Sequence, residues 1–123
     1  MIRYLFMREK LRDPLRIKHM LDAIHNVNMY MKDRSEEDLI SNSMLFYAVV
    51  KNIEIIGEAA YKLTNEFKDA HPKTPWRQIV AMRHILVHGY YQVTADEIFN
   101  VYEQDLPLLL QQLSSYMDDV KDI

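Results

Sequence analysis

The stretch from Met82 to Tyr91, MRHILVHGYY, places an arginine, two histidines and two tyrosines around one of the two glycines of the chain. Arg83 carries a permanent planar charge that suits two-pronged contact with a phosphate. His88 carries an imidazole, the group that most often moves protons in catalysis. Together they could cleave a phosphodiester, with His88 moving a proton and Arg83 stabilising the developing charge. The alternative is a helix-terminal histidine beside a surface arginine.

The spacing of these two residues sets a geometric condition. Arg83 and His88 are five positions apart, which is about 140° around a regular helix. They can share one face only where the helix ends between them. Gly89 predicts such an end, because glycine commonly sits just past the last turn of a helix.

His84 and His88 suggest a second chemistry. They are four positions apart and share a helix face, as zinc-binding histidine pairs do. A metal site needs at least a third ligand, and no spacing ties Glu54 or Glu58 to the histidines. We therefore expect no metal and no cofactor. The alternative, a metal-dependent hydrolase, predicts that a chelator abolishes activity.

The elements that must position this stretch have the spacing of helices, with apolar residues every three or four positions. Long helices are expected to begin near Asp13-Pro14, near Leu45, at Thr74-Pro75 and at the Thr94–Glu97 capping box, with a short helix after Ser35. An unbroken apolar stripe predicts that the second long helix continues to Phe67, and Pro107 predicts a kink in the last one. The expected fold is all-α, an antiparallel four-helix-type bundle with an additional short helix, filling residues 1–123 as one domain.

Gly57 lies inside the expected second long helix, where a glycine costs about 1 kcal/mol relative to alanine. With Ala59 and Ala60 it forms a smooth patch that another backbone can approach. Two uses are open: tight packing within the chain, or a helix crossing at the interface of a dimer.

Composition excludes several classes of protein. The chain has no cysteine, no apolar run near the ~20 residues that span a bilayer, and no signal-peptide pattern at its start. We therefore expect a cytoplasmic location and no membrane partner. The net charge of −3 argues by itself against nucleic-acid binding. Basic residues nevertheless gather near the start, at Arg3, Arg8, Lys10, Arg12, Arg16 and Lys18. They form either a local basic surface or a solvated helix face.

The motif stretch resembles the R-x-x-x-x-H-x-Y signature of HEPN-domain proteins of the HepT-like toxin family. Arg83, His88 and Tyr90 stand at its three fixed positions. Three longer segments are similar to the family's second helix, its third helix with the following loop, and its proline-marked last helix: NIEIIGEAAYKL, PWRQIVAMRHILVHGYY and EQDLPLLLQQL. His84 departs from the small polar or acidic residue expected there.

The resemblance implies a homodimeric HEPN fold and a metal-independent endoribonuclease toxin that acts on RNA. Its active site would lie in the dimer cleft, with Arg83 and His88 contributed by both subunits. It also implies an antitoxin partner, an MNT-type minimal nucleotidyltransferase, which neutralises the toxin by attaching AMP to Tyr90. Tyr91, expected to pack against the bundle, is the competing modification site. The alternative is a non-catalytic helical module that binds nucleotide or positions a nucleotidyltransferase.

Overall fold

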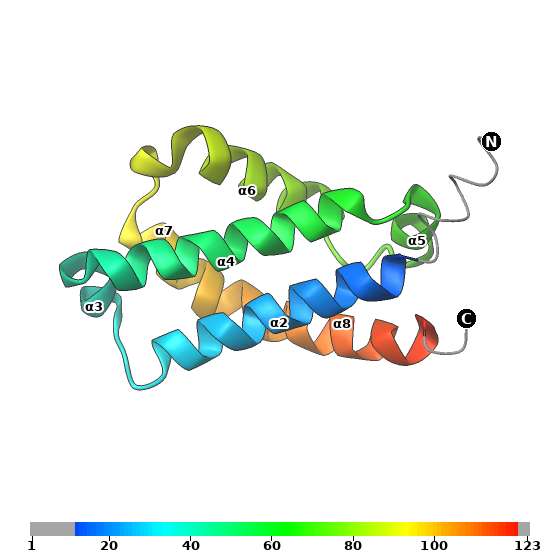
Figure 1. Ribbon diagram of the computed structural model, residues 1–123, viewed down its shortest axis with the longest axis horizontal. Coiled ribbons are helices and arrows are strands. Elements are labelled where there is room, and N and C mark those ends of the chain that lie inside the picture. Colours follow the sequence, from blue (N-terminus) through cyan, green and yellow to red (C-terminus); the bar gives the residue numbers. More distant parts are fainter. Residues whose placement is uncertain (1–11, 121–123) are drawn as a thin grey trace.

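The computed structural model describes residues 12–120, and it describes side chains as far as residue 118. No strand occurs between residues 12 and 120. The helical elements are α2 (Asp13–Met31), α3 (Glu36–Ser41), α4 (Ser43–Lys62), α5 (Asn65–Ala70), α6 (Trp76–Gly89), the 3₁₀ turn η1 (Tyr90–Gln92), α7 (Ala95–Asn100), the π-helical turn η2 (Val101–Asp105) and α8 (Leu106–Val120). Successive long helices run in alternating directions (Figure 1), which confirms the expected all-α, antiparallel bundle.

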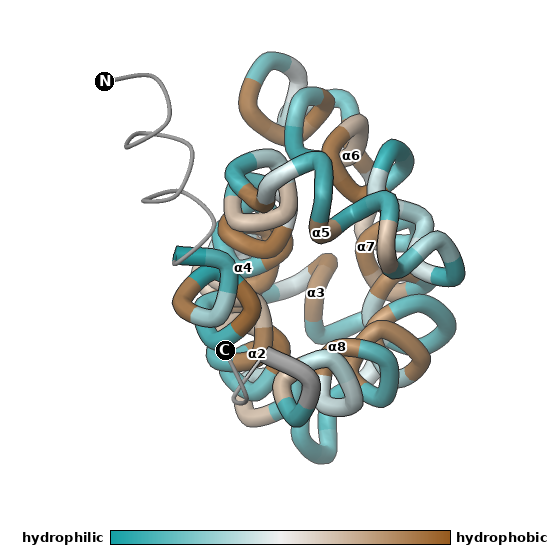
Figure 2. Tube along the Cα trace, turned by 90° about the vertical axis from the view of Figure 1, so that its right-hand side faces the viewer, coloured by the Kyte–Doolittle hydropathy of each residue, from teal (hydrophilic) through white to brown (hydrophobic). Residues whose placement is uncertain are grey.

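The core lies where the long helices face one another, around a shared interior (Figure 2). α2 packs against both α4 and α8, while α6 packs against another side of α4 (Figure 1). The stripe predicted on α2 is fully buried, at Ile17, Met20, Ile24, Val27 and Met31. Three predicted basic residues, Arg3, Arg8 and Lys10, lie outside the described residues. The single domain over residues 1–123 stays a prediction for the same reason.

The chain breaks between α4 and α5, although the apolar stripe predicts one helix as far as Phe67; that prediction is wrong. Thr64 starts α5, with its Oγ1 accepting the N–H of Phe67 at 3.1 Å. The buried carboxylate of Asp13 accepts bonds from the backbone N–H of Thr64 at 3.0 Å and from its hydroxyl at 2.7 Å. Because Asp13 lies 51 residues away in the sequence, local periodicity carries no sign of this break.

The start of α6 is fixed by side chains of other elements. The hydroxyl of buried Thr74 lies 2.7 Å from that of Tyr116 and donates to Oε1 of Gln112 at 2.8 Å. The indole N–H of Trp76 donates to the carbonyl of His71 at 2.9 Å. Thr74 therefore ties α6 to α8, and α6 begins one residue after the expected Pro75, at Trp76.

The last long helix is divided near Pro107, as expected. Thr94 starts α7, with its hydroxyl oxygen accepting the N–H of Glu97 at 3.2 Å. Pro107 has no N–H to donate to the turn before it, and its ring collides with the carbonyl four residues back. The chain adapts with the π-helical turn η2 immediately before α8. Between residues 12 and 120, no helix combines the length and apolar character needed to cross a bilayer.

Candidate active site

Arg83 lies on the face of α6 that packs against α4, directly over Gly57. A Cβ atom at residue 57 would overlap the Cβ of Arg83 and lie 3.0 Å from the carbonyl oxygen of Ile79. Glycine therefore lets the two helices cross this closely. Of the two uses that the sequence left open for Gly57, the structure shows packing within the chain. Gly57 consequently gives no support to a dimer interface.

The guanidinium of Arg83 is held by side chains of α4. Its Nε lies 2.7 Å from Oε2 of Glu58, and its Cζ lies 5.9 Å from the ring centre of Tyr61. The Nε–H does not point at the carboxylate, so the contact is an ion pair without hydrogen-bond geometry. Glu58 also pairs with Lys62, at 3.5 Å between Oε1 and Nζ. With 29% of its side chain exposed, Arg83 is held in position and still reachable from solvent.

His88 lies in the last turn of α6 and is exposed. The helix continues through His88 to Gly89, so the prediction that it ends between Arg83 and His88 is wrong. The two side chains thus lie about 140° apart around one helix. Arg83 faces α4 whereas His88 faces solvent, so one copy of α6 does not turn both toward a single phosphate.

Gly89 is the last residue of α6, but it lacks the left-handed conformation that favours glycine. Its φ is −151°, which other residues adopt. A Cβ atom there would meet only Oε1 of Gln92, at 3.6 Å, an ordinary contact. The chain then continues directly into η1.

Tyr90 and Tyr91 both reach solvent from η1. The ring of Tyr90 is 46% exposed and packs edge-on against Tyr47 of α4, with ring centres 6.0 Å apart. Tyr91 is 73% exposed, so the expectation that it packs against the bundle is wrong. Its ring contacts Tyr90 edge-on at 5.9 Å. Exposure alone therefore does not distinguish Tyr90 from Tyr91 as a modification site.

His84 and His88 lie side by side on the exposed face of α6, with ring centres 4.6 Å apart. Among the residues that the structure describes, no group of three or more histidines and carboxylates is placed to hold a metal ion. No described residue therefore supplies this pair with the third ligand that a zinc site requires.

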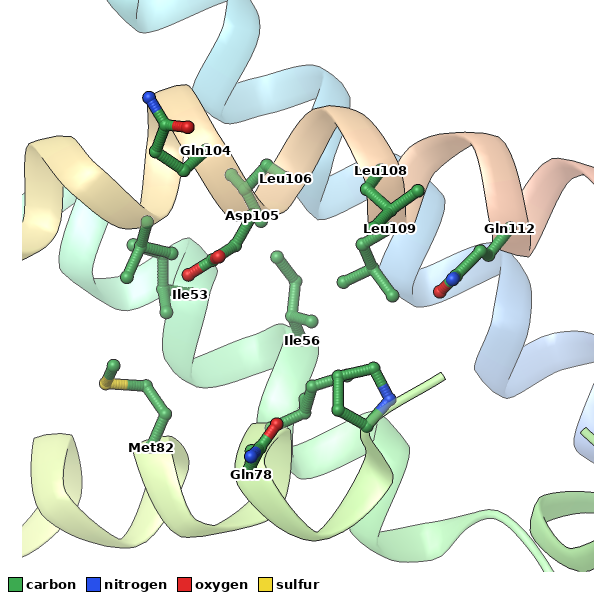
Figure 3. Close-up of a pocket in the computed structure, with 13 residues that line it drawn as sticks. Ile53, Ile56, Gln78, Met82, Gln104, Asp105, Leu106, Leu108, Leu109 and Gln112 are labelled. Carbon is green, nitrogen blue, oxygen red and sulfur yellow. The ribbon is translucent and has the colours of Figure 1, made fainter. Parts of the chain in front are cut away.

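A separate cleft of about 240 Å³ opens between α4, α6 and the η2–α8 segment (Figure 3). Ile53, Ile56, Met82 and Leu109 point into it. Its polar lining consists of glutamine amides and the carboxylate of Asp105, without a cation. This chemistry does not suit a phosphate, and none of the predicted site residues lines the cleft.

Sequence reasoning singled out Gly57 and named Glu58 but did not connect either residue with Arg83. Gly57 sets the helix crossing beneath it, and Glu58 pairs with its guanidinium. The signal that was available is the run Gly57-Glu58 followed by Tyr61-Lys62. On a helix, residues three or four positions apart are neighbours. The run therefore places a glycine that another helix can approach next to a carboxylate and a cation.

Comparison with known proteins gives a consistent result. The family model "Ribonuclease HepT-like" matches residues 20–116. A protein of Thermococcus cleftensis named probable ribonuclease HepT is 31% identical over 93 residues, which cover 76% of this chain and 84% of that protein. A candidate RNase of Methanocaldococcus jannaschii is 31% identical over 94 residues, which cover 76% of this chain and 86% of that protein.

A second protein of Methanocaldococcus jannaschii, named for both a gamma-glutamylcyclotransferase and a candidate RNase, is 33% identical over 104 residues. The match covers 85% of this chain but 47% of that protein, so the chain spans about half the length of this relative. No solved structure matches the chain.

Proposed function

Because this chain belongs to the HepT-like ribonuclease family, an endoribonuclease class, we propose that it cleaves RNA without a metal ion, with Arg83 and His88 as its catalytic residues. The observation that carries the proposal is the placement of Arg83. Its guanidinium is fixed by Gly57 and Glu58 yet remains open to solvent on the motif-bearing helix. A fixed cation of this kind suits a transition state that gains negative charge.

The chemistry uses the nucleophile that RNA itself supplies. The ribose 2′-oxygen attacks the adjacent phosphorus while a base takes its proton. The bond from phosphorus to the 5′-oxygen breaks, and that oxygen gains a proton from an acid. His88 serves as acid or base, and Arg83 stabilises the charge on the phosphate oxygens. The products are a 2′,3′-cyclic phosphate and a 5′-hydroxyl, so DNA is not cleaved.

The active site is composite and belongs to a homodimer. Arg83 and His88 of one chain face different directions, so a second copy is needed to bring an arginine and a histidine to one phosphate. Exposed apolar side chains on both helices are available for contact with a second copy, at Met44, Tyr47 and Tyr61 of α4 and at Ile85 of α6.

The protein acts as the toxin of a toxin–antitoxin pair. Its partner is an MNT-type nucleotidyltransferase that attaches AMP to Tyr90. Tyr90 follows His88 by two residues and reaches solvent. An added AMP would place a bulky anion beside the catalytic pair and compete with RNA for Arg83.

The test is incubation of the purified chain with single-stranded RNA in EDTA, followed by product analysis. We expect the wild-type chain to yield cyclic-phosphate products and the Arg83→Ala and His88→Ala chains to yield none. Arg83→Lys should lower the rate by about 10²-fold, because lysine lacks the planar fork. His84→Ala should matter less than His88→Ala. Intact RNA would favour the non-catalytic module, and activity that EDTA abolishes would favour a metal-dependent hydrolase.

A further inference from the structure

A groove runs beside Arg83, along the face of α4 that lies between α2 and α6. It has a volume of about 350 Å³. Side chains that carry or can carry positive charge line it, namely Arg16, His19, Lys51, Lys62 and Arg83. Two carboxylates, Glu54 and Glu58, line it as well. We call it the α2–α4–α6 groove.

The charge of this groove is opposite in sign to that of the whole chain. Four cations and two carboxylates leave two positive charges, not counting His19, whereas the chain carries −3. Both carboxylates are paired, Glu54 with Lys51 at 3.4 Å and Glu58 with Lys62 at 3.5 Å. Such exposed ion pairs are weak, so a ligand with several negative charges can compete for the lysines.

The two arginines of the groove supply a second observation. The Nε atoms of Arg16 and Arg83 are buried and make no hydrogen bond within the described part of the chain, although Oε2 of Glu58 lies 2.7 Å from Nε of Arg83. Because both Nε atoms are shielded from solvent, a phosphate in the groove would be bound by the outer nitrogens of the guanidinium groups, which remain donors.

We propose that the α2–α4–α6 groove binds the sugar-phosphate backbone of the RNA strand on which Arg83 acts, an inference that rests on the proposed function. Phosphate oxygens are strong acceptors for guanidinium groups. Lys51 and Lys62 are eleven residues apart on α4, which extends the positive surface by about 16 Å. That length suits a strand and exceeds what a mononucleotide needs. Because no Phe, Tyr or Trp side chain of the described residues lines the groove, it contacts backbone rather than stacked bases and has little sequence preference.

The experiment measures binding of a labelled single-stranded RNA to the full chain carrying His88→Ala, which keeps the strand intact, at several salt concentrations. Arg16→Gln, Lys51→Gln and Lys62→Gln each remove one charge and retain most of the side-chain stem. Each should weaken binding several-fold at low salt and reduce the slope of log K against log salt by about 0.7. Lys51 and Lys62 are exposed, so their substitution tests the groove even if the Arg16 variant fails to fold.

Matched controls come from the exposed turn after α2, where Lys32→Gln and Arg34→Gln remove the same charge. This turn lies at the opposite end of α2 from Arg16, and both controls should bind like the parent. Groove variants that bind like these controls, or controls that lose as much affinity as the groove variants, would overturn the proposal. Cleavage by the wild-type chain is measured separately. RNA that stays intact but binds through the groove would refute the ribonuclease and leave the groove assignment standing.

Discussion

At the scale of single residues, Arg83 is held by what surrounds it. Because residue 57 is a glycine, the backbone at Arg83 packs close to α4. The carboxylate of Glu58 and the ring of Tyr61 hold the guanidinium of Arg83. A side chain fixed in this way loses less conformational freedom when it binds a phosphate. Glu58 also competes with that phosphate for the guanidinium of Arg83, which lowers the affinity of Arg83 for phosphate.

Tyr90 carries the first prediction. Co-expression with the cognate nucleotidyltransferase should yield protein heavier by one or more AMP units, all on Tyr90. Tyr90 lies next to Tyr47 of α4 and two residues from His88, so AMP on its hydroxyl would crowd the catalytic face. Tyr90→Phe should block modification and leave a toxin that the partner cannot silence by that route. Intact-mass and peptide mass spectrometry give the readout.

Tyr91 is the matched control, because its ring is more exposed than that of Tyr90 and one residue away. Tyr91→Phe should be modified like wild type. AMP found on Tyr91, or neutralisation of Tyr90→Phe without any modification, would overturn the assignment.

At the scale of helices, the crossing of α4 and α6 carries the second prediction. Gly57→Ala should destabilise the protein by about 1–3 kcal/mol, because the added methyl group overlaps Arg83 at a packed crossing. Cleavage should fall as well, since Arg83 must move. Chemical denaturation monitored by circular dichroism gives the free energy of unfolding.

Gly89→Ala is the control for this substitution. Its new methyl group would meet only Oε1 of Gln92, at an ordinary 3.6 Å, so stability should change little. Helix propensity alone favours alanine over glycine by about 1 kcal/mol. A Gly57→Ala chain that gained stability by that amount would show that the crossing is looser than described.

The junction of α3 and α7 carries the third prediction. Loss of solvent around Glu36, a hydrogen bond to Asp96 and the charges of Asp96, Glu37 and Glu103 raise the pKa of Glu36 above its ordinary 4.5. The folded state therefore binds this proton more tightly than the unfolded state. Glu36 consequently reduces stability as pH rises through that window.

Glu36→Gln should raise the melting temperature at pH 7, and its advantage should shrink as pH falls through the raised pKa and vanish below 4.5. Glu37→Gln removes the same charge from the same first turn of α3 and should have a smaller effect. Thermal melts from pH 4 to 8 make the comparison. Equal effects of the two substitutions at all pH values would contradict this account.

Most of the helices could be predicted from sequence because their signals are local. The buried stripe of α2, the Thr94 start of α7 and the division near Pro107 all follow from spacing and caps. The break before α5 could not, because its cause is a contact between Thr64 and Asp13, far apart in the chain. The same limit applies to Arg83: its residue type is visible in sequence, but its packing over Gly57 is a tertiary contact.

At the scale of the whole molecule, an acidic protein must still attract an anionic substrate. The net charge of −3 repels RNA at a distance, while the α2–α4–α6 groove is locally positive. Two copies in one dimer would bring two such grooves and two pairs of catalytic residues together.

The composite site carries the last prediction. Arg83→Ala and His88→Ala chains are each expected to be inactive alone. When they are co-expressed, a mixed dimer can pair the intact Arg83 of one chain with the intact His88 of the other, giving one complete site. Random pairing puts about half of the chains in mixed dimers with one of two sites intact, so activity should recover to about a quarter of wild type. Light scattering of the same samples should give the mass of a dimer. If activity stays absent while mixed dimers form, the arrangement proposed for Arg83 and His88 is wrong. Each site would then take both residues from one chain, or would need two arginines and two histidines.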